Sequence, residues 1–121
     1  MMLGVMLLAG VSASSDADAA NAVYTQCLFA VSRNANAAHL SVGAFEEKLE
    51  RSCASEQADL ERAAARILKA RGDADASSKA KRMANGSRRM VVDSYRKTRE
   101  LEPQLKEVAA LCKAHPEQCR D

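Results

Sequence analysis

Four cysteines and two histidines are the residues of this 121-residue chain that could bind a metal, carry redox chemistry or form cross-links. Cys112, His115 and Cys119 have the side chains of a zinc site, but a closed structural site needs four ligands and the sequence offers no fourth nearby. No C-x-x-C motif is present to indicate thioredoxin-like chemistry. The even number of cysteines instead favours two disulfides, and we predict no metal and no cofactor.

The N-terminus begins with an apolar run at residues 3–11, followed by small residues that suit a signal peptidase. This run is too short for the roughly 20 residues that a membrane-spanning helix needs. We therefore predict a signal peptide over residues 1–13, cleaved after Ala13 or later after Ala19, and a periplasmic or secreted protein whose mature form has no transmembrane segment. The alternatives are a cytoplasmic protein that starts with an apolar helix and an uncleaved anchor, because no Lys or Arg precedes the run.

The rest of the chain is predicted to be all-α, because it is rich in Ala, has two Pro and shows no β-branched alternation. We expect a mature N-terminal segment at 14–20, a helical bundle at 21–114 and a C-terminal tail at 115–121. An antiparallel up-down bundle of three long helices, cross-linked by disulfides, satisfies this pattern.

The helix ends follow from capping residues. Asp16 or Asp18 should cap the first helix, which ends near Ala38. Ser41 should then cap the second helix, and Gly72 should end it in the left-handed conformation.

The third helix should start after the polar link at 73–78 and meet Pro103. Proline lacks the backbone N–H and clashes with the preceding turn. Either the helix kinks there or Pro103 starts a short C-terminal helix, which should stop before Pro116.

Facing residues of an antiparallel hairpin have position numbers that add to a constant. A sum of 80 places Cys27 opposite Cys53, which predicts a disulfide between them and leaves Cys112 to bond Cys119. The same register pairs Val31 with Leu49, Ala35 with Phe45 and Ala20 with Leu60.

A second register, with a sum near 150, pairs the second helix with the third and places Met83, Met90 and Leu101 in the core. Core packing is therefore a better explanation of these methionines than haem ligation together with His39 or His115. One bundle satisfies both registers.

Candidate catalytic groups are few. The acids of the second helix alternate with Lys and Arg, which is typical of a solvated, salt-bridged face, and no Gly-rich phosphate loop is present. Glu56 falls on the apolar stripe beside Tyr24, where a buried carboxylate needs a partner. We expect a hydrogen bond to Tyr24 or a boundary position, and the alternative is a ligand contact. We do not predict an enzyme.

The formal net charge is only +2, yet residues 79–99 hold basic residues at 79, 81, 82, 88, 89, 96, 97 and 99 against a single acid. Arg82, Arg89 and Arg96 recur every seven residues and, with Lys79, form the candidate anion-binding surface. Such a surface attracts phosphate-bearing partners in a salt-dependent way. No aromatic residue lies on this stripe to stack on bases, so nucleic acid is not expected. The alternative is a solvated face without a partner.

Three short segments carry a resemblance: Tyr24-x-x-Cys27-Leu28-Phe29, Cys53 after a turn, and Ser94-Tyr95-Arg96 on a basic helix. Through them the chain resembles small uncharacterised exported α-helical bacterial proteins. The resemblance implies a helical periplasmic fold, and it implies no activity and no functional residues.

The sequence thus predicts a non-enzymatic exported binding or interaction protein, docking on an anionic envelope component or a client protein through its third helix. The alternative is a small exported inhibitor or ligand carrier. An exposed apolar patch beside the basic stripe would favour the first, and a closed cavity at the Tyr24 and Glu56 layer would favour the second.

Overall fold

The computed structural model describes the backbone of residues 2–120 and the side chains of residues 16–120. Within them the chain is all-helical and contains no strand, as predicted. No helix in this described part is both long enough and apolar enough to cross a membrane. The elements are α1 (Met2–Ala37), α2 (Val42–Ser52), α3 (Ala54–Ala70), α4 (Ala76–Ala114) and the short 3₁₀ helix η1 (Pro116–Cys119).

The predicted caps between the helices are present. Ser41 has an extended backbone (φ −63°, ψ 161°), and its Oγ accepts a hydrogen bond from the N–H of Ala44 at 3.2 Å. His39 (φ 54°) and Gly72 (φ 80°) take the left-handed conformation that reverses the chain after α1 and α3. Helix α4 ends at Ala114, two residues before the next proline.

The start of α1 differs from the prediction, because the backbone is helical from Met2 and not first at Asp16 or Asp18. The helix therefore continues through Ala13, the predicted cleavage site. The side chains of the predicted signal peptide lie outside the described residues, so its cleavage remains a prediction.

The second of the three predicted long helices is divided into α2 and α3 by a break at Cys53 (φ −114°, ψ 14°). At the break the Cys53 N–H donates to the Leu49 carbonyl and the Cys53 carbonyl accepts from the N–H of Gln57, both at 3.0 Å. Its side chain is 1 % exposed and bonded to Cys27. The break lets each half of the segment bury its own apolar face.

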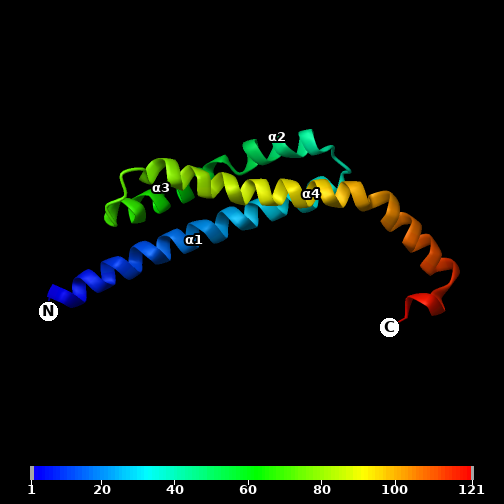
Figure 1. Cartoon of the computed structure of the whole chain (residues 1–121), viewed down its shortest axis with the longest axis horizontal. Helices are drawn as coiled ribbons and strands as arrows, with labels where there is room; N and C mark the ends of the chain where they lie inside the picture. The colour runs from blue at the N-terminus through cyan, green and yellow to red at the C-terminus, as the bar shows by residue number, and fades with distance from the viewer. Residues whose placement is uncertain (1, 121) are drawn as a thin grey trace.

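Pro103 lies inside α4, so the predicted separate C-terminal helix is wrong and the kinked alternative holds. Figure 1 shows α4 changing direction in its orange part and leaving the bundle. Proline explains the change, because its ring displaces the carbonyl of Arg99 and it donates no hydrogen bond. We call residues 104–119 the C-terminal arm. All of them are exposed except Cys112, which is half-buried.

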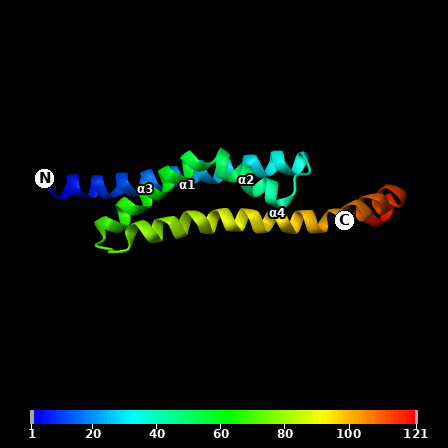
Figure 2. The ribbon, with the colours of Figure 1, turned by 90° about the horizontal axis from the view of Figure 1, so that it is seen from above.

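Figures 1 and 2 show α1 and α4 running in the same direction, with α2 and α3 returning beside them. Two tyrosine contacts fix the offset between the long helices. The Tyr24 hydroxyl lies 3.4 Å from the Ala84 carbonyl, and the Tyr95 hydroxyl lies 3.2 Å from the Ala35 carbonyl. Both pairs are 60 residues apart in sequence, so one register holds along this interface.

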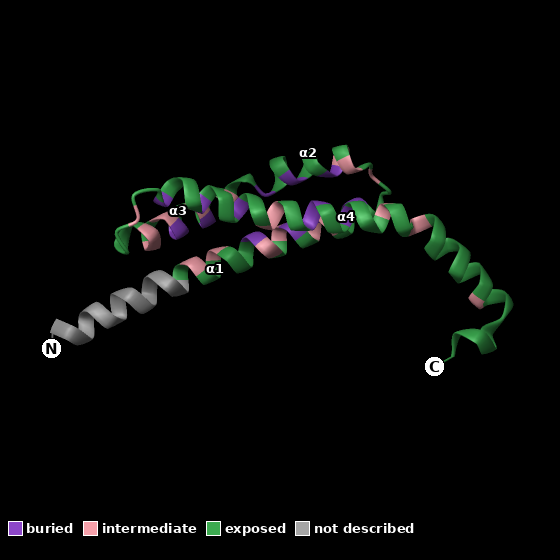
Figure 3. Ribbon diagram, in the orientation of Figure 1, coloured by how far each residue is buried: buried purple, intermediate pink, exposed green. Residues whose placement is uncertain are grey.

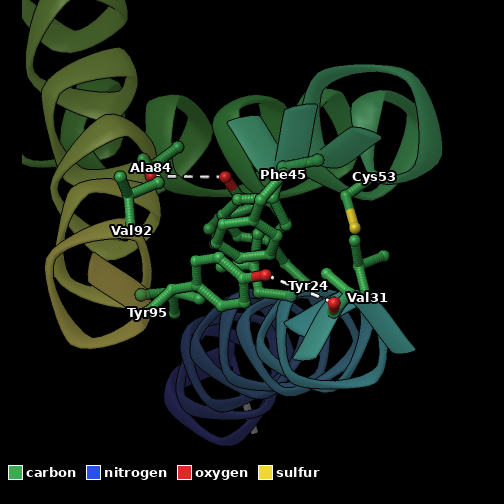
Figure 4. Close-up of a cluster of buried hydrophobic side chains, with 12 residues drawn as sticks. Tyr24, Val31, Phe45, Cys53, Ala84, Val92 and Tyr95 are labelled. Carbon is green, nitrogen blue, oxygen red and sulfur yellow. Dashed lines mark hydrogen bonds between the residues drawn. The ribbon is translucent and has the colours of Figure 1, made fainter. Parts of the chain in front are cut away.

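Three aromatic rings fill the centre of the core. Phe45 and Tyr95 stack with their centroids 4.1 Å apart, and Figure 4 shows Tyr24 beside them. The guanidinium of Arg99 covers the outer side of the Tyr95 ring at 5.6 Å. Helix α4 contributes mainly small residues to this core, which lets its backbone approach α1 and α3. The buried residues of α4 are Ala76, Ala80, Ala84, Val91, Val92 and Tyr95.

The predicted register between the second helix and α4 is wrong. Met83, Met90 and Leu101 are 57 %, 74 % and 47 % exposed instead of buried. The stacked pair Phe45 and Tyr95 sets the sum of position numbers at 140 rather than near 150. With Tyr95 filling the space opposite Phe45, α4 turns its alanines inward and its methionines outward. Figure 3 shows α4 with both buried and exposed segments.

Both predicted disulfides are present. The Sγ atoms of Cys27 and Cys53 are 2.05 Å apart, and those of Cys112 and Cys119 are 2.04 Å apart. The first bond joins α1 to the α2–α3 break, and closing a loop of this length stabilises a fold by roughly 3–4 kcal/mol. The second bond joins the end of α4 to η1, far from the core.

Replacing Tyr95 with Phe tests the α1–α4 contact. The Tyr95 hydroxyl lies 2.6 Å from the carbonyl of Leu40 as well as 3.2 Å from that of Ala35. Losing this donor in a buried place should lower the free energy of unfolding by about 1–3 kcal/mol, measured by urea denaturation of the oxidised protein.

Thr98→Val is the matched control, since the Thr98 hydroxyl bonds the Ser94 carbonyl on the exposed side of α4. It should change the free energy of unfolding by no more than about 0.5 kcal/mol. Equal effects of the two substitutions would contradict the assigned contact.

Candidate functional site

The predicted anion-binding residues lie along α4, and the structure divides them among different surroundings. One side of α4 forms a groove of about 690 Å³ with α2. Arg89 and Arg96 line this groove, whereas Lys79 and Arg82 do not. The charged residues around it are Glu46, Glu47, Glu50, Arg88, Arg89, Asp93 and Arg96.

One acid of α2 and one acid of α4 pair with two of the arginines that line this groove. Arg88 pairs with Glu50 across the two helices at 3.5 Å, and Arg96 pairs with Asp93 along α4 at 3.1 Å. The stripe is therefore not a continuous positive surface. The sequence placed these acids on a separate solvated face, and only the packing of α2 on α4 brings the two sets together.

Lys79 is also engaged, because its Nζ lies 2.6 Å from Asp73 Oδ2. This hydrogen bond, together with one from the backbone N–H of Asp75, lowers the pKa of the Asp73 carboxyl. Arg82 and Arg89 make no ion pair in the part of the chain whose side chains are described. Of the four predicted residues, these two are free to meet an external anion.

Large apolar side chains form an exposed line along α4. Steps of seven and eleven residues return to nearly the same side of a helix, which aligns Met83, Met90, Leu101 and Val108. Leu105 and Leu111 lie beside this line in the C-terminal arm. These six side chains, which we call the α4 apolar stripe, are 47–74 % exposed.

Within the described residues Tyr24 forms no hydrogen bond with Glu56, which corrects that expectation, whereas Glu56 is half-buried, as expected for a boundary position. The Tyr24 hydroxyl lies 3.3 Å from Gln57 Oε1, one residue further along, because the break at Cys53 shifts the register of α3. Gln57 also donates to Glu61 at 3.1 Å. Oε2 of Glu56 is buried without a hydrogen-bond partner.

The environment of Tyr24 changes its acidity. Burial of the side chain raises the pKa of the Tyr24 hydroxyl, the nearby Arg88 lowers it, and Glu61 raises it further, with burial as the largest cause. This phenol therefore stays protonated and serves as a hydrogen-bond donor within the core.

A polar cluster at the end of the bundle was not anticipated from the sequence. Arg99 lies 3.1 Å from Glu102 and 3.0 Å from Asn36 Oδ1, and the His39 ring lies 3.0 Å from Glu102. The cluster joins the turn after α1 to α4 above the Tyr95 ring. No sequence motif marks it, because Asn36 and His39 are 60 or more residues from Arg99 and Glu102 and meet them only through the α1–α4 offset.

Cys112, His115 and Cys119, the side chains considered as zinc ligands, make other interactions in the structure. Cys112 and Cys119 bond each other, and His115 lies 3.7 Å from Glu117. No group of three His, Cys, Asp or Glu side chains within the described residues is placed to hold a metal ion.

No family model, curated protein or solved structure matches this chain. The candidate site is therefore defined by the geometry of its own residues. That geometry consists of charged grooves beside α4 and an exposed apolar stripe along it.

The acidity of Tyr24 can be measured directly, because the chain has two tyrosines and Tyr95→Phe leaves one. In that variant the ultraviolet titration of the native protein should have a midpoint above the ordinary tyrosine value of about 10. A raised native pKa contributes stability at pH values below about 10 and loses it as the pH rises through the native pKa.

The same variant unfolded in urea provides the reference titration. Its midpoint should lie below that of the native protein. A native midpoint at or below the unfolded one would contradict a buried Tyr24 hydroxyl.

Proposed function

We propose that this chain is a non-enzymatic, exported helical interaction protein that docks on an anionic partner through the exposed side of α4. The observation that carries this proposal is the α4 apolar stripe lying next to two arginines without ion pairs. The partner we favour is a phosphate-bearing component of the cell envelope, and an acidic client protein is the other outcome of the test.

The apolar stripe supports docking because such surfaces are costly to leave in water. Single exposed apolar residues are ordinary, whereas several on one side of a helix favour an interaction site. Here six exposed apolar side chains recur from the bundle into the C-terminal arm, with Ser87, Ser94 and Thr98 between those of the bundle.

The charges support an anionic partner. Arg82 and Arg89 point to one flank of the stripe, seven residues apart, so they lie on the same side of α4. Their side chains can contact phosphate or carboxylate groups while the stripe contacts apolar groups of the same partner.

The two disulfides support an oxidising compartment, because such bonds persist mainly outside the cytoplasm. They agree with the signal peptide predicted at residues 1–13. Periplasmic or secreted localisation is therefore part of the proposal.

The inhibitor or carrier alternative finds less support. A carrier was expected to hold its ligand at the Tyr24 and Glu56 layer. Tyr24 is 0 % exposed, packs in the main core, and has its hydroxyl within hydrogen-bond distance of Gln57 and Ala84.

Cosedimentation with phosphatidylglycerol vesicles tests the proposal. The oxidised protein should bind at low ionic strength and be released at high ionic strength. Arg82→Gln/Arg89→Gln should weaken binding by about tenfold or more, since each basic residue near an anionic surface contributes on the order of 1 kcal/mol. Met83→Ser/Met90→Ser should weaken it as well.

Lys48→Gln/Arg51→Gln is the control, because it removes the same charge from exposed positions of α2. All variants keep the same N-terminal segment, so any binding by that segment cancels. If wild type stays in the supernatant at low salt, or if the α2 control loses as much binding as the α4 variants, docking on lipid through α4 is excluded.

A further inference from the structure

A second groove lies nearer the start of α4, between its first turns and the end of α3. It has a volume of about 700 Å³. Figures 1 and 2 show these two segments side by side where the loop after α3 turns back. The charged and polar residues that line it are Glu61, Arg62, Arg66, Lys69, Ser77 and Lys81.

This groove is basic, in contrast to the groove beside α2. It has four basic residues and one acid, whereas the other has three basic residues and four acids. Arg62 pairs with Asp59, and Glu61 accepts a hydrogen bond from Gln57. Arg66, Lys69 and Lys81 have no ion pair in the described part of the chain, so their charges are available to an anion.

The sequence explains how the groove forms. Arg62, Arg66 and Lys69 are spaced by four and three residues, which places them on one face of α3. Ser77 and Lys81 are spaced by four on α4. The reversal at Gly72 turns the two faces toward each other.

Small side chains keep the space between the helices open. Ala58 and Ala65 line the groove between the longer basic side chains. A methyl group fills little of the space, and basic side chains of both helices line the open groove that remains. An anion in this volume can contact groups from both helices.

We propose that the α3–α4 groove binds a phosphate group. The fork of Arg66 matches phosphate oxygens in a two-point contact, Lys69 and Lys81 add charge, and the Ser77 hydroxyl can donate one hydrogen bond. A phosphate monoester fits this set better than a carboxylate, because it offers three oxygens and close to two negative charges. The proposal does not depend on docking through the apolar stripe.

Calorimetric titration with inorganic pyrophosphate at low ionic strength tests the site. The oxidised protein should show saturable binding, and Arg66→Gln/Lys69→Gln should weaken it by about tenfold or more, since hydrogen bonds to charged groups contribute about 1.5–3 kcal/mol each. Both positions are exposed, so the fold should be kept, and far-ultraviolet circular dichroism checks this.

Arg82→Gln/Arg89→Gln is the matched control, because it removes two charges of α4 that do not line the groove. It should change the affinity for pyrophosphate by less than about threefold, as expected for screened charges at a distance. Absence of saturable binding, or equal losses in the two double variants, would overturn the site in favour of diffuse attraction.

Vesicles that contain phosphatidic acid distinguish the source of the phosphate. If Arg66→Gln/Lys69→Gln also weakens sedimentation with these vesicles, the groove accepts a lipid phosphate. If it weakens only pyrophosphate binding, the groove accepts a soluble phosphate compound. In the phosphatidylglycerol assay, Arg82→Gln/Arg89→Gln tests docking through the exposed side of α4. The two proposals are therefore tested by different variants, and either can fail without the other.

Discussion

The side chain of Tyr95, on α4, contacts both α1 and α2, and the arrangement of the bundle depends on its position. Its hydroxyl reaches the carbonyls of Ala35 and Leu40 at the end of α1, while its ring stacks on Phe45 of α2. A buried phenol must find acceptors, and backbone carbonyls at the end of α1 and in the turn after it supply them, although the Ala35 carbonyl also accepts from the Leu40 N–H at 3.0 Å. This contact sets the 60-residue offset between α1 and α4, and the Tyr24 contact to Ala84 repeats it.

The rotation of α4 about its axis then decides which of its residues can meet a partner. Alanines face the core, so Met83 and Met90 face solvent. The same rotation places Arg88 and Arg96 beside the acids that line the α2–α4 groove, and Lys81 beside the basic face of α3. One packing choice thus accounts for the weakly charged groove, the basic groove and the apolar stripe. Beyond Pro103 the C-terminal arm leaves the bundle, so no other described element covers its apolar side chains.

Local signals in the sequence predicted much of the fold. The parts that depend on packing between residues far apart in the sequence could not be predicted in this way. The caps at Ser41 and Gly72, both disulfide pairs and the burial of Phe45 and Leu49 follow from residue types and spacing, because each depends on neighbours in one hairpin. Which face of α4 is buried does not follow from such local signals. Met and Ala residues both recur at helical spacing on α4, and the spacing alone favoured the larger side chains as core residues. The actual interface needs the smaller ones, because Tyr24 and Tyr95 already fill the space.

The orientation of α4 is the central claim, and nuclear magnetic resonance with a soluble paramagnetic agent tests it most directly. If α4 has this orientation, the agent should strongly broaden the Met83 and Met90 methyl signals and leave the Leu49 methyls protected. The rings of Phe45 and Tyr95 should show contacts with each other. Protected methionine methyls with contacts to Leu60 would mean that α4 is turned the other way, and the stripe and both grooves would then have to be abandoned.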